Sequence, residues 1–259
     1  MKITYLYLTI FLLVLGCKED ENKSIEKDKL SNHQEWSYEG EAGPEHWKEL
    51  TNNSECGGNF QSPINLVKYT KNKNLKPIDF RYDEKTVLHS VENNGHTIKY
   101  NFEPGDYISW EGKNYNLTQF HFHEPAEHLI DGVRYPLAIH LVHQTKNGEL
   151  LVIEILAKEG HNREPFDFLE SFLPIQKGEE KLINRSFDMN LNLPSNKNYL
   201  TYVGSLTTPP CSEGVRWIIF EKPILVSLEQ VEMLKYLMPI KNYREEQPVH
   251  GRKIEQSSF

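Results

Sequence analysis

Residues 118–143 constrain this chain more than any other stretch, because they hold two apolar segments with histidines at fixed spacing. The first, residues 119–123, reads Gln-Phe-His-Phe-His. Alternate residues of a strand lie on opposite faces, so Gln119, His121 and His123 share one face. The β-carbons of the two histidines then lie roughly 6 to 7 Å apart, which suits two nitrogens that bind one ion. The spacing therefore predicts a metal site built on a strand.

A third ligand is expected from a neighbouring strand. Residues Leu137 to Gln144 are apolar enough for a buried strand, and they include His140 and His143. These two histidines are three positions apart, so they face opposite sides of the strand and only one can join the pair. We predict that the third ligand is His140.

The same histidines could also belong to a second set of metal ligands. His121-x-His123-x-x-x-Glu127 is also the spacing by which many double-stranded β-helix (cupin) proteins bind iron or manganese. In that interpretation Glu127 is a ligand and His140 need not be. A buried histidine that is simply hydrogen-bonded in the core is the plain alternative for each imidazole.

The amino-terminal residues resemble an export signal. Lys2 precedes an apolar run, Ile3 to Leu15, that is too short to span a bilayer and is followed by Gly and Cys17. This pattern resembles a bacterial lipoprotein signal, so we expect residues 1–16 to be removed and Cys17 to be lipidated. The charged residues 17–35 would form a disordered tether. The protein would be exported to the periplasm or cell envelope, with the lipid on Cys17 as its only membrane attachment.

The charge and the cysteines narrow the setting further. The formal net charge is −8, and loss of Lys2 with the signal makes it more negative, which argues against nucleic acid as a partner. With Cys17 set aside, Cys56 and Cys211 remain, and they would be free to pair in an oxidising compartment. Such a bond would close a loop of about 155 residues and stabilise the fold by about 5 kcal/mol in the chain-entropy model. Two buried thiols are the alternative.

Residues 36–259 predict one mainly β domain. Apolar strand-like runs flank turn sequences and form hairpin-like patterns, including Leu137 to Gln144 with Leu150 to Ala157. Helical patterns are few: a short turn with Pro44 at its first position, the run Pro165 to Leu173, and a helix opened by the capping box at Ser227. We therefore expect a large central, mostly antiparallel, twisted sheet with short peripheral helices.

Several separate motifs, in order, resemble the α-class carbonic anhydrases. They are Gly43-Pro44-Glu45-His46-Trp47, Gln61-Ser62-Pro63-Ile64, Asn93-Asn94-Gly95-His96, Gln119 to His123, Glu127-His128, His140-Leu141-Val142-His143, Gly204 to Cys211 and Val215-Arg216-Trp217. The resemblance implies a ten-stranded sheet, a zinc ion on His121, His123 and His140, and reversible hydration of carbon dioxide to bicarbonate by zinc-bound hydroxide. Three neutral imidazoles leave the double positive charge of zinc undiminished, whereas a carboxylate ligand would cancel half of it.

The resemblance also implies roles for the surrounding residues. Glu127 would accept a hydrogen bond from Thr207, which orients the hydroxide, and His96 would carry the proton outward. The other assignments are an apolar pocket of Val142, Leu206 and Trp217, a polar side of Tyr38, Asn94 and Thr208, support from Gln119, Asn242 and Arg244, and a disulfide between Cys56 and Cys211.

Two positions depart from the pattern of the family. Ala138 stands where a glutamate is common, which removes an expected hydrogen-bond acceptor for His140 and would cost about 10- to 100-fold in metal affinity or activity. Lys99 stands where an asparagine is common, and we expect it to lower the pKa of His96 by charge repulsion. A carbonic anhydrase-like binding domain without catalysis is the second interpretation, although such a domain should have lost a ligand.

Overall fold

The computed structural model describes residues 35–50, 54–239 and 241–259. These residues form one compact unit. The predicted export signal, Cys17 with its lipid, and the tether as far as residue 34 lie outside the described residues. No helix in the described part of the chain is long and apolar enough to cross a membrane.

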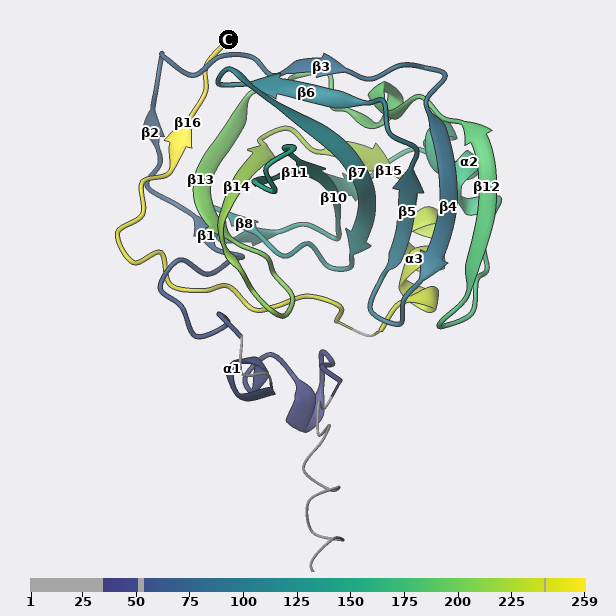
Figure 1. Cartoon of the computed structure of the whole chain (residues 1–259), viewed down its shortest axis with the longest axis horizontal. Coiled ribbons are helices and arrows are strands. Elements are labelled where there is room, and N and C mark those ends of the chain that lie inside the picture. Colours follow the sequence, from purple (N-terminus) through teal and green to yellow (C-terminus); the bar gives the residue numbers. More distant parts are fainter. Residues whose placement is uncertain (1–34, 51–53, 240) are drawn as a thin grey trace, which may run out of the picture. The chain divides into compact units, whose positions relative to one another are not determined.

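One large sheet dominates the described residues (Figure 1). Its strands, in the order in which they pair, are β12 (Glu180–Ser186), β4 (Val87–Asn93), β5 (Ile98–Phe102), β7 (Lys113–His123), β10 (Leu137–Gln144), β11 (Leu150–Glu159), β14 (Glu213–Phe220), β13 (Tyr199–Ser205), β16 (Glu255–Gln256) and β2 (Thr70–Lys71). Off this path, β3 (Asp79–Arg81) pairs with β6 (Tyr107–Trp110), β6 pairs with β7, and β15 (Ile224–Val226) pairs with β11. A smaller sheet joins β1 (Asn65–Leu66), β8 (Leu129–Ile130) and β9 (Val133–Arg134).

Most neighbouring strands of the large sheet run antiparallel, as predicted. Parallel pairing occurs where β11 meets β14 and β15, and where β16 meets β2. Ten strands lie along the main path in the described residues, the number that the resemblance implies. The predicted fold class, a mainly β chain with a large central twisted sheet, is confirmed.

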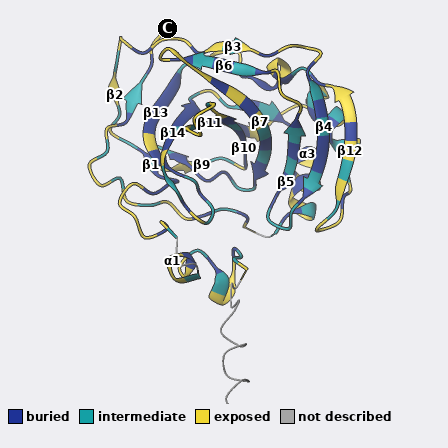
Figure 2. Cartoon of the chain, in the orientation of Figure 1, coloured by how far each residue is buried: buried dark blue, intermediate teal, exposed yellow. Residues whose placement is uncertain are grey.

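The central strands are buried on both faces, and each face has its own apolar cluster. Leu137, Ile139 and Leu141 of β10 belong to the larger cluster. Ala138 and, at its margin, Val142 belong to the smaller cluster. Figure 2 shows burial concentrated in β10, β11 and β14, whereas β12 at the edge is largely exposed. The strand alternation therefore places His140 on the face of the smaller cluster.

Helices are short and lie at the periphery, as predicted. They are α1 (Trp47–Leu50), α2 (Glu164–Glu170) and α3 (Leu228–Leu237), with 3-10 turns η1 (Gly40–Ala42) and η2 (Met189–Asn192). The capping box at the start of α3 is present, with the Ser227 side chain accepting from the N–H of Gln230. Pro44 begins a turn, residues 44–46, in which the N–H of His46 donates to the backbone oxygen of Gly43 at 2.9 Å, and α1 follows directly at Trp47. Helix α2 ends before the predicted limit at Leu173.

Candidate metal centre

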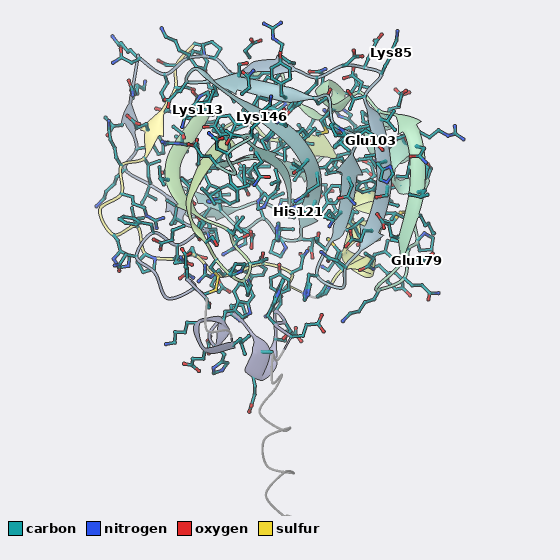
Figure 3. The ribbon with its side chains drawn as sticks, in the orientation of Figure 1. Lys85, Glu103, Lys113, His121, Lys146 and Glu179 are labelled. Atoms are coloured by element: carbon teal, nitrogen blue, oxygen red, sulfur yellow. A yellow bond between two sulfur atoms is a disulfide. The ribbon has the colours of Figure 1, made fainter. Side chains whose placement is uncertain are left out.

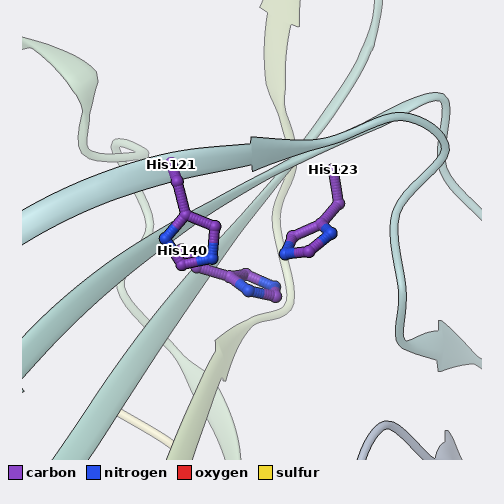
Figure 4. Close-up of side chains that lie close together, drawn as sticks. All are labelled: His121, His123 and His140. Carbon is purple, nitrogen blue, oxygen red and sulfur yellow. The ribbon is translucent and has the colours of Figure 1, made fainter. Parts of the chain in front are cut away.

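Three histidines gather where β7 and β10 run side by side (Figure 4). His121 and His123 project from one face of β7, and His140 of β10 is paired directly with His121. The ring centroids are 5.1 Å apart for His121 and His123, 5.3 Å for His121 and His140, and 4.5 Å for His123 and His140. One nitrogen of each ring lies within 4.8 Å of the others. Figure 3 shows His121 in the interior of the view, whereas Lys85 and Glu179 lie at the rim.

The two histidines of β7 each commit one ring nitrogen to the protein. Nδ1 of His121 donates to Oε1 of Gln119 at 2.9 Å. Nδ1 of His123 donates to the backbone oxygen of Asn242 at 2.6 Å, and its buried Nε2 has no hydrogen-bond partner among the described residues. Fixing one nitrogen of an imidazole through a protein acceptor is the usual arrangement of a metal-binding histidine.

His140 is turned the other way round. Its Nε2 lies 3.6 Å from Oε1 of Glu154, and its Nδ1 lies 3.9 Å from Oε2 of Glu127. The same Glu127 oxygen lies 3.5 Å from Nε2 of His123. Nδ1 is therefore the nitrogen of His140 that faces the other two histidines. The donor set is therefore Nε2, Nε2 and Nδ1, and it fits a zinc ion with three imidazole ligands.

Burial keeps the imidazoles of β7 neutral. It lowers the pKa of His121 well below the ordinary value, and the positive charges of His123, His140 and Lys99 would lower it further. Burial also lowers the pKa of His123, although the charge of Glu127 opposes the shift. Neutral imidazole is the form that binds a metal.

Glu127 is fully buried beside the cluster. Its Oε1 accepts a hydrogen bond from the backbone N–H of Arg244 at 2.9 Å, and its Oε2 has no hydrogen-bond partner among the described residues. The hydrogen bond from Thr207 that the resemblance implies is not formed in this structure, so that pairing stays a prediction. Glu127 is also outside the group of converging ligand atoms found in the described residues, which favours three imidazoles over the cupin ligand set.

Asn242 supports the end of β7 from the carboxy-terminal loop. Its side-chain oxygen accepts from the N–H of Glu124 at 2.7 Å, and its side-chain nitrogen donates to the backbone oxygens of Phe122 at 3.0 Å and His96 at 3.2 Å. The residue is completely buried. Asn242 therefore ties the strand that carries two ligands to the turn that carries His96, as predicted for a supporting residue.

Arg244 links the same loop to the disulfide. Its guanidinium donates to Oε1 of Gln61 at 2.8 Å and to the backbone oxygens of Ser62 and Cys56, each at 2.9 Å. Burial lowers its pKa to about 10, while Glu127 opposes the shift. Cys56 is bonded to Cys211, which confirms the predicted disulfide and indicates maturation in an oxidising compartment.

The residues predicted to form an apolar pocket lie on the face of the sheet that carries the three histidines. The ring of Trp217 is buried and lies 5.0 Å from the ring of His140. Val142 and Leu206 are partly buried against the same apolar cluster. Two threonines follow Leu206 in the chain: Thr207 is buried and Thr208 is partly exposed. The apolar wall and the two threonines thus adjoin in sequence at Leu206.

His96 lies on the turn between β4 and β5, as predicted. Its ring is half-buried and stacks on Trp36, with centroids 3.7 Å apart and an interplanar angle of 13°. The ring of Tyr38, which is buried, lies 6.3 Å away. Burial lowers the pKa of His96; the charge of Glu35 opposes this shift and that of Lys177 adds to it.

Asn94 and Lys99 each make a contact that the sequence did not predict. The side-chain oxygen of Asn94 accepts from the backbone N–H groups of His96 and Thr97, both at 2.9 Å, so it shapes the turn. Lys99 forms an ion pair with Glu92 at 2.8 Å. The prediction that Lys99 lowers the pKa of His96 was wrong, because residue 99 lies on β5 opposite residue 121 and a different lysine is the cation that acts on His96.

A buried polar chain behind His140 was missed by the sequence reasoning. Glu154 in β11 is paired directly with His140, and its Oε2 lies 2.5 Å from Nδ1 of His128. Nε2 of His128 lies 2.7 Å from the hydroxyl of Tyr202, which lies 2.7 Å from Oγ of Ser62. A carboxylate in the middle of the apolar run from Leu150 to Ala157 was the signal that could have revealed it.

The expected loss of a partner for His140 is therefore corrected. Ala138 is buried and has no polar atom to offer, as the sequence states. Glu154 supplies a carboxylate from the neighbouring strand instead. Directly paired residues of two strands have β-carbons about 4.5–5.5 Å apart, closer than residues two apart on one strand, so strand pairing provides the shorter approach.

The three histidines and the apolar residues beside them define a class of site. Three neutral imidazoles on an antiparallel sheet converge on one point, and the described residues place no fourth protein ligand there. Structural zinc sites usually have four protein ligands, whereas catalytic sites keep one position open. The geometry thus fits a catalytic metal centre with an apolar wall.

Comparisons with known proteins identify the family. The sequence model of the eukaryotic-type carbonic anhydrases matches residues 42–258. A carbonic anhydrase of Pectobacterium carotovorum is 36% identical over 221 residues, covering 85% of this chain and 89% of the relative. The chain belongs to the eukaryotic-type, or α, carbonic anhydrase family.

Solved structures agree with this assignment. A hyperthermostable carbonic anhydrase from an active hydrothermal vent chimney has a TM-score of 0.83 and 41% identity, covering 86% of this chain and 100% of that one. Dioscorin complexed with ascorbate has a TM-score of 0.78 and 31% identity, covering 86% and 97%. The fold is therefore shared by carbonic anhydrases and by dioscorin, which was solved in complex with ascorbate.

Proposed function

We propose that this chain hydrates carbon dioxide reversibly to bicarbonate and a proton at a zinc ion bound by His121, His123 and His140. The proposal is carried by the convergence of three imidazoles, each with one nitrogen facing a protein acceptor and the other facing a shared space. When bound, zinc supplies a Lewis acid that lowers the pKa of a water ligand, for which carbonic anhydrase itself is the standard example.

Thr207 and Glu127 orient the attacking group in this proposal. The Thr207 hydroxyl accepts a hydrogen bond from the nucleophile and donates its own proton to Oε2 of Glu127. That oxygen is buried and has no other partner in the described residues, and a buried carboxylate oxygen without a hydrogen bond is costly. The backbone N–H of Arg244 fixes the other oxygen. Glu127 is thus available to one more donor on the side of the cluster.

Substrate and proton take different sides of the site. Carbon dioxide has no net charge, and the apolar side chains of Val142, Leu206 and Trp217 give it a surface beside the metal. Thr208, which is partly exposed, contributes a hydroxyl to the polar side. His96 is the group that accepts the proton and releases it to solvent, because its ordinary pKa lies near neutrality and it sits on a turn.

Metal content and activity test this proposal together. Purified protein should contain one zinc ion per chain and should hydrate carbon dioxide in a stopped-flow assay with a pH indicator. Zinc without activity would favour the binding-domain alternative, for which ascorbate is one ligand to try in view of the dioscorin structure. Iron or manganese at the site would favour the cupin interpretation.

The setting of the enzyme is part of the proposal. We infer that residues 1–16 direct export and are removed, that a lipid on Cys17 is the only membrane attachment, and that residues 17–35 tether the catalytic domain, residues 36–259, in the periplasm or cell envelope. The disulfide supports the export step. Replacing Cys17→Ser should move the protein from the membrane fraction to the soluble fraction without changing its specific activity.

A further inference from the structure

Glu154 is a carboxylate placed in the middle of an apolar strand. It is 0% exposed, and its neighbours along β11 are Ile153 and Ile155. Its two oxygens face the imidazoles of His128, at 2.5 Å, and His140, at 3.6 Å, and have no other partner in the described residues. Burying a carboxylate is costly unless it is paired. These two imidazoles are therefore the reason that a charged residue is tolerated in this strand.

The carboxylate is held from behind by a chain of hydrogen bonds. Nε2 of His128 lies 2.7 Å from the hydroxyl of Tyr202, and that hydroxyl lies 2.7 Å from Oγ of Ser62. Oγ of Ser62 also accepts from the N–H of Ser205 at 3.0 Å. Both His128 and Tyr202 are almost completely buried. The position of Glu154 is thus set by several elements and not by its own rotamer alone.

The same atoms do not form a second metal site. His128, His140 and Glu154 do place one possible ligand atom each within 4.8 Å of one another. Two ligands of a tetrahedral zinc ion with bonds of about 2.0 Å would lie about 3.3 Å apart. The separation of 2.5 Å between His128 and Glu154 is that of a charge-assisted hydrogen bond. An imidazole that gives Nδ1 to a metal also keeps its proton on Nε2, so that nitrogen of His140 is a donor.

We propose that Glu154 is the positioning residue of the third zinc ligand, a role that rests on the proposed zinc site. Nε2 of His140 lies 3.6 Å from Oε1 of the carboxylate, and a hydrogen bond from Nε2–H to that oxygen in the zinc-loaded protein would fix the tautomer with Nδ1 turned toward the other two histidines of Figure 4. The negative charge also increases the basicity of Nδ1 toward the metal. Residue 138, on the same face of β10, is alanine and has no acceptor, so the neighbouring strand performs this task.

The test measures zinc release from full-length, zinc-loaded protein into a strong chelator at neutral pH. Glu154→Ala should release zinc roughly 10- to 100-fold faster than the wild type, the usual effect of removing such a partner. Glu154→Gln keeps an acceptor oxygen without the charge and should show a smaller increase. His143→Gln, a buried histidine on the other face of the same strand, is the matched control and should release zinc at the wild-type rate.

A second readout separates positioning from general stability. In the proton NMR spectrum of the zinc-loaded protein, the downfield Nε2–H signal of His140 should disappear or move upfield in Glu154→Ala and remain in His143→Gln. The double variant Ala138→Glu with Glu154→Ala supplies a carboxylate from the strand of His140 itself, and recovery of slow zinc release there would support the inference.

Two results would overturn the inference. One is zinc release at the wild-type rate in both Glu154→Ala and Glu154→Gln; should the alanine variant not fold, the glutamine variant alone decides. The other is two zinc ions per wild-type chain, one of them lost in Glu154→Gln. A wild-type chain that binds no zinc at all would instead refute the proposed function, so the two failures can be told apart.

Discussion

Two buried histidines lie three residues apart on β10 and face opposite sides of the sheet. His140 faces the other two imidazoles and has no aligned hydrogen bond to its Nε2. His143 faces the larger apolar cluster, where its Nε2 lies 2.6 Å from the Tyr82 hydroxyl and its Nδ1 donates to the backbone oxygen of Leu141 at 3.0 Å. Their exposed fractions are 1% and 0%. Residue type and burial therefore do not mark a ligand; the face of the strand, and the groups that the ring meets there, do.

The difference teaches how one sheet separates chemistry from stability. On its face of the sheet both ring nitrogens of His143 are paired, and the surroundings are the main apolar core. On the face of His140 polar atoms remain without partners inside the protein, which is costly unless something else binds them. We expect substitutions on the two faces to have different signatures.

The largest effect should come from replacing each of the two histidines, His140 and His143, by alanine. His140→Ala should abolish zinc binding and carbon dioxide hydration, because two imidazoles do not make a tight site for zinc. His143→Ala should retain one zinc ion and lose stability instead. Metal analysis of both purified variants, with the hydration assay, provides the measurement. Retained zinc in His140→Ala together with lost zinc in His143→Ala would show that the assigned strand face is wrong.

Thr207 tests whether a hydroxyl on the site face acts on the reaction rather than on the fold. Thr207→Ala should keep its zinc and lose about 100-fold in turnover, since misplacing the reacting group by about 1 Å has an effect of that size. Thr201→Ala is a matched control, because that buried hydroxyl donates to the backbone oxygen of Trp217 on the adjacent strand. Equal turnover in the two variants would contradict the orienting role.

His96 tests the outer end of the site. His96→Ala should keep its zinc but lower turnover at saturating carbon dioxide in dilute buffer by roughly 100-fold, the lower end of the effect of losing a positioned proton acceptor. Added imidazole should restore the rate, because a small base can replace the missing group. An undiminished rate in weak buffer, or no recovery with imidazole, would rule out His96 as the proton shuttle.

The smallest effect concerns the pH dependence of stability on the face of His143. Burial lowers the pKa of His143 to about 3, below the ordinary value of about 6.5 for an unfolded chain. The unfolded state alone therefore takes up a proton between these values, and stability present above pH 6.5 is lost as the pH falls. Between pH 7 and pH 5 this group should cost about 2 kcal/mol of unfolding free energy.

The variant His143→Gln isolates this contribution. Urea unfolding of zinc-free wild type and variant at both pH values gives the comparison, and the wild type should lose about 2 kcal/mol more than the variant over this interval. The zinc-free proteins are used so that the pH dependence of metal binding does not enter. An identical loss in both proteins would mean that His143 is protonated in the folded state as readily as in the unfolded one.

Local patterns determined much of this protein. The period of two in residues 119–123 and the apolar run at 137–144 predicted two strands and the face that each histidine occupies, and the bounds of β10 agree with the prediction. The capping box at Ser227 located the start of α3. These features depend on neighbours within a few residues, which is the range over which backbone geometry imposes a period.

The register between paired strands was decided only by the tertiary structure. Glu154 stands opposite His140 because β10 and β11 align in one register, and no local pattern distinguishes that register from a shift by two residues. The same holds for Lys99, whose position opposite residue 121 keeps it from acting on His96. A contact between strands depends on the packing of the whole sheet. The sequence therefore predicted the three candidate ligands, whereas the register of β10 against β11 placed Glu154 beside His140.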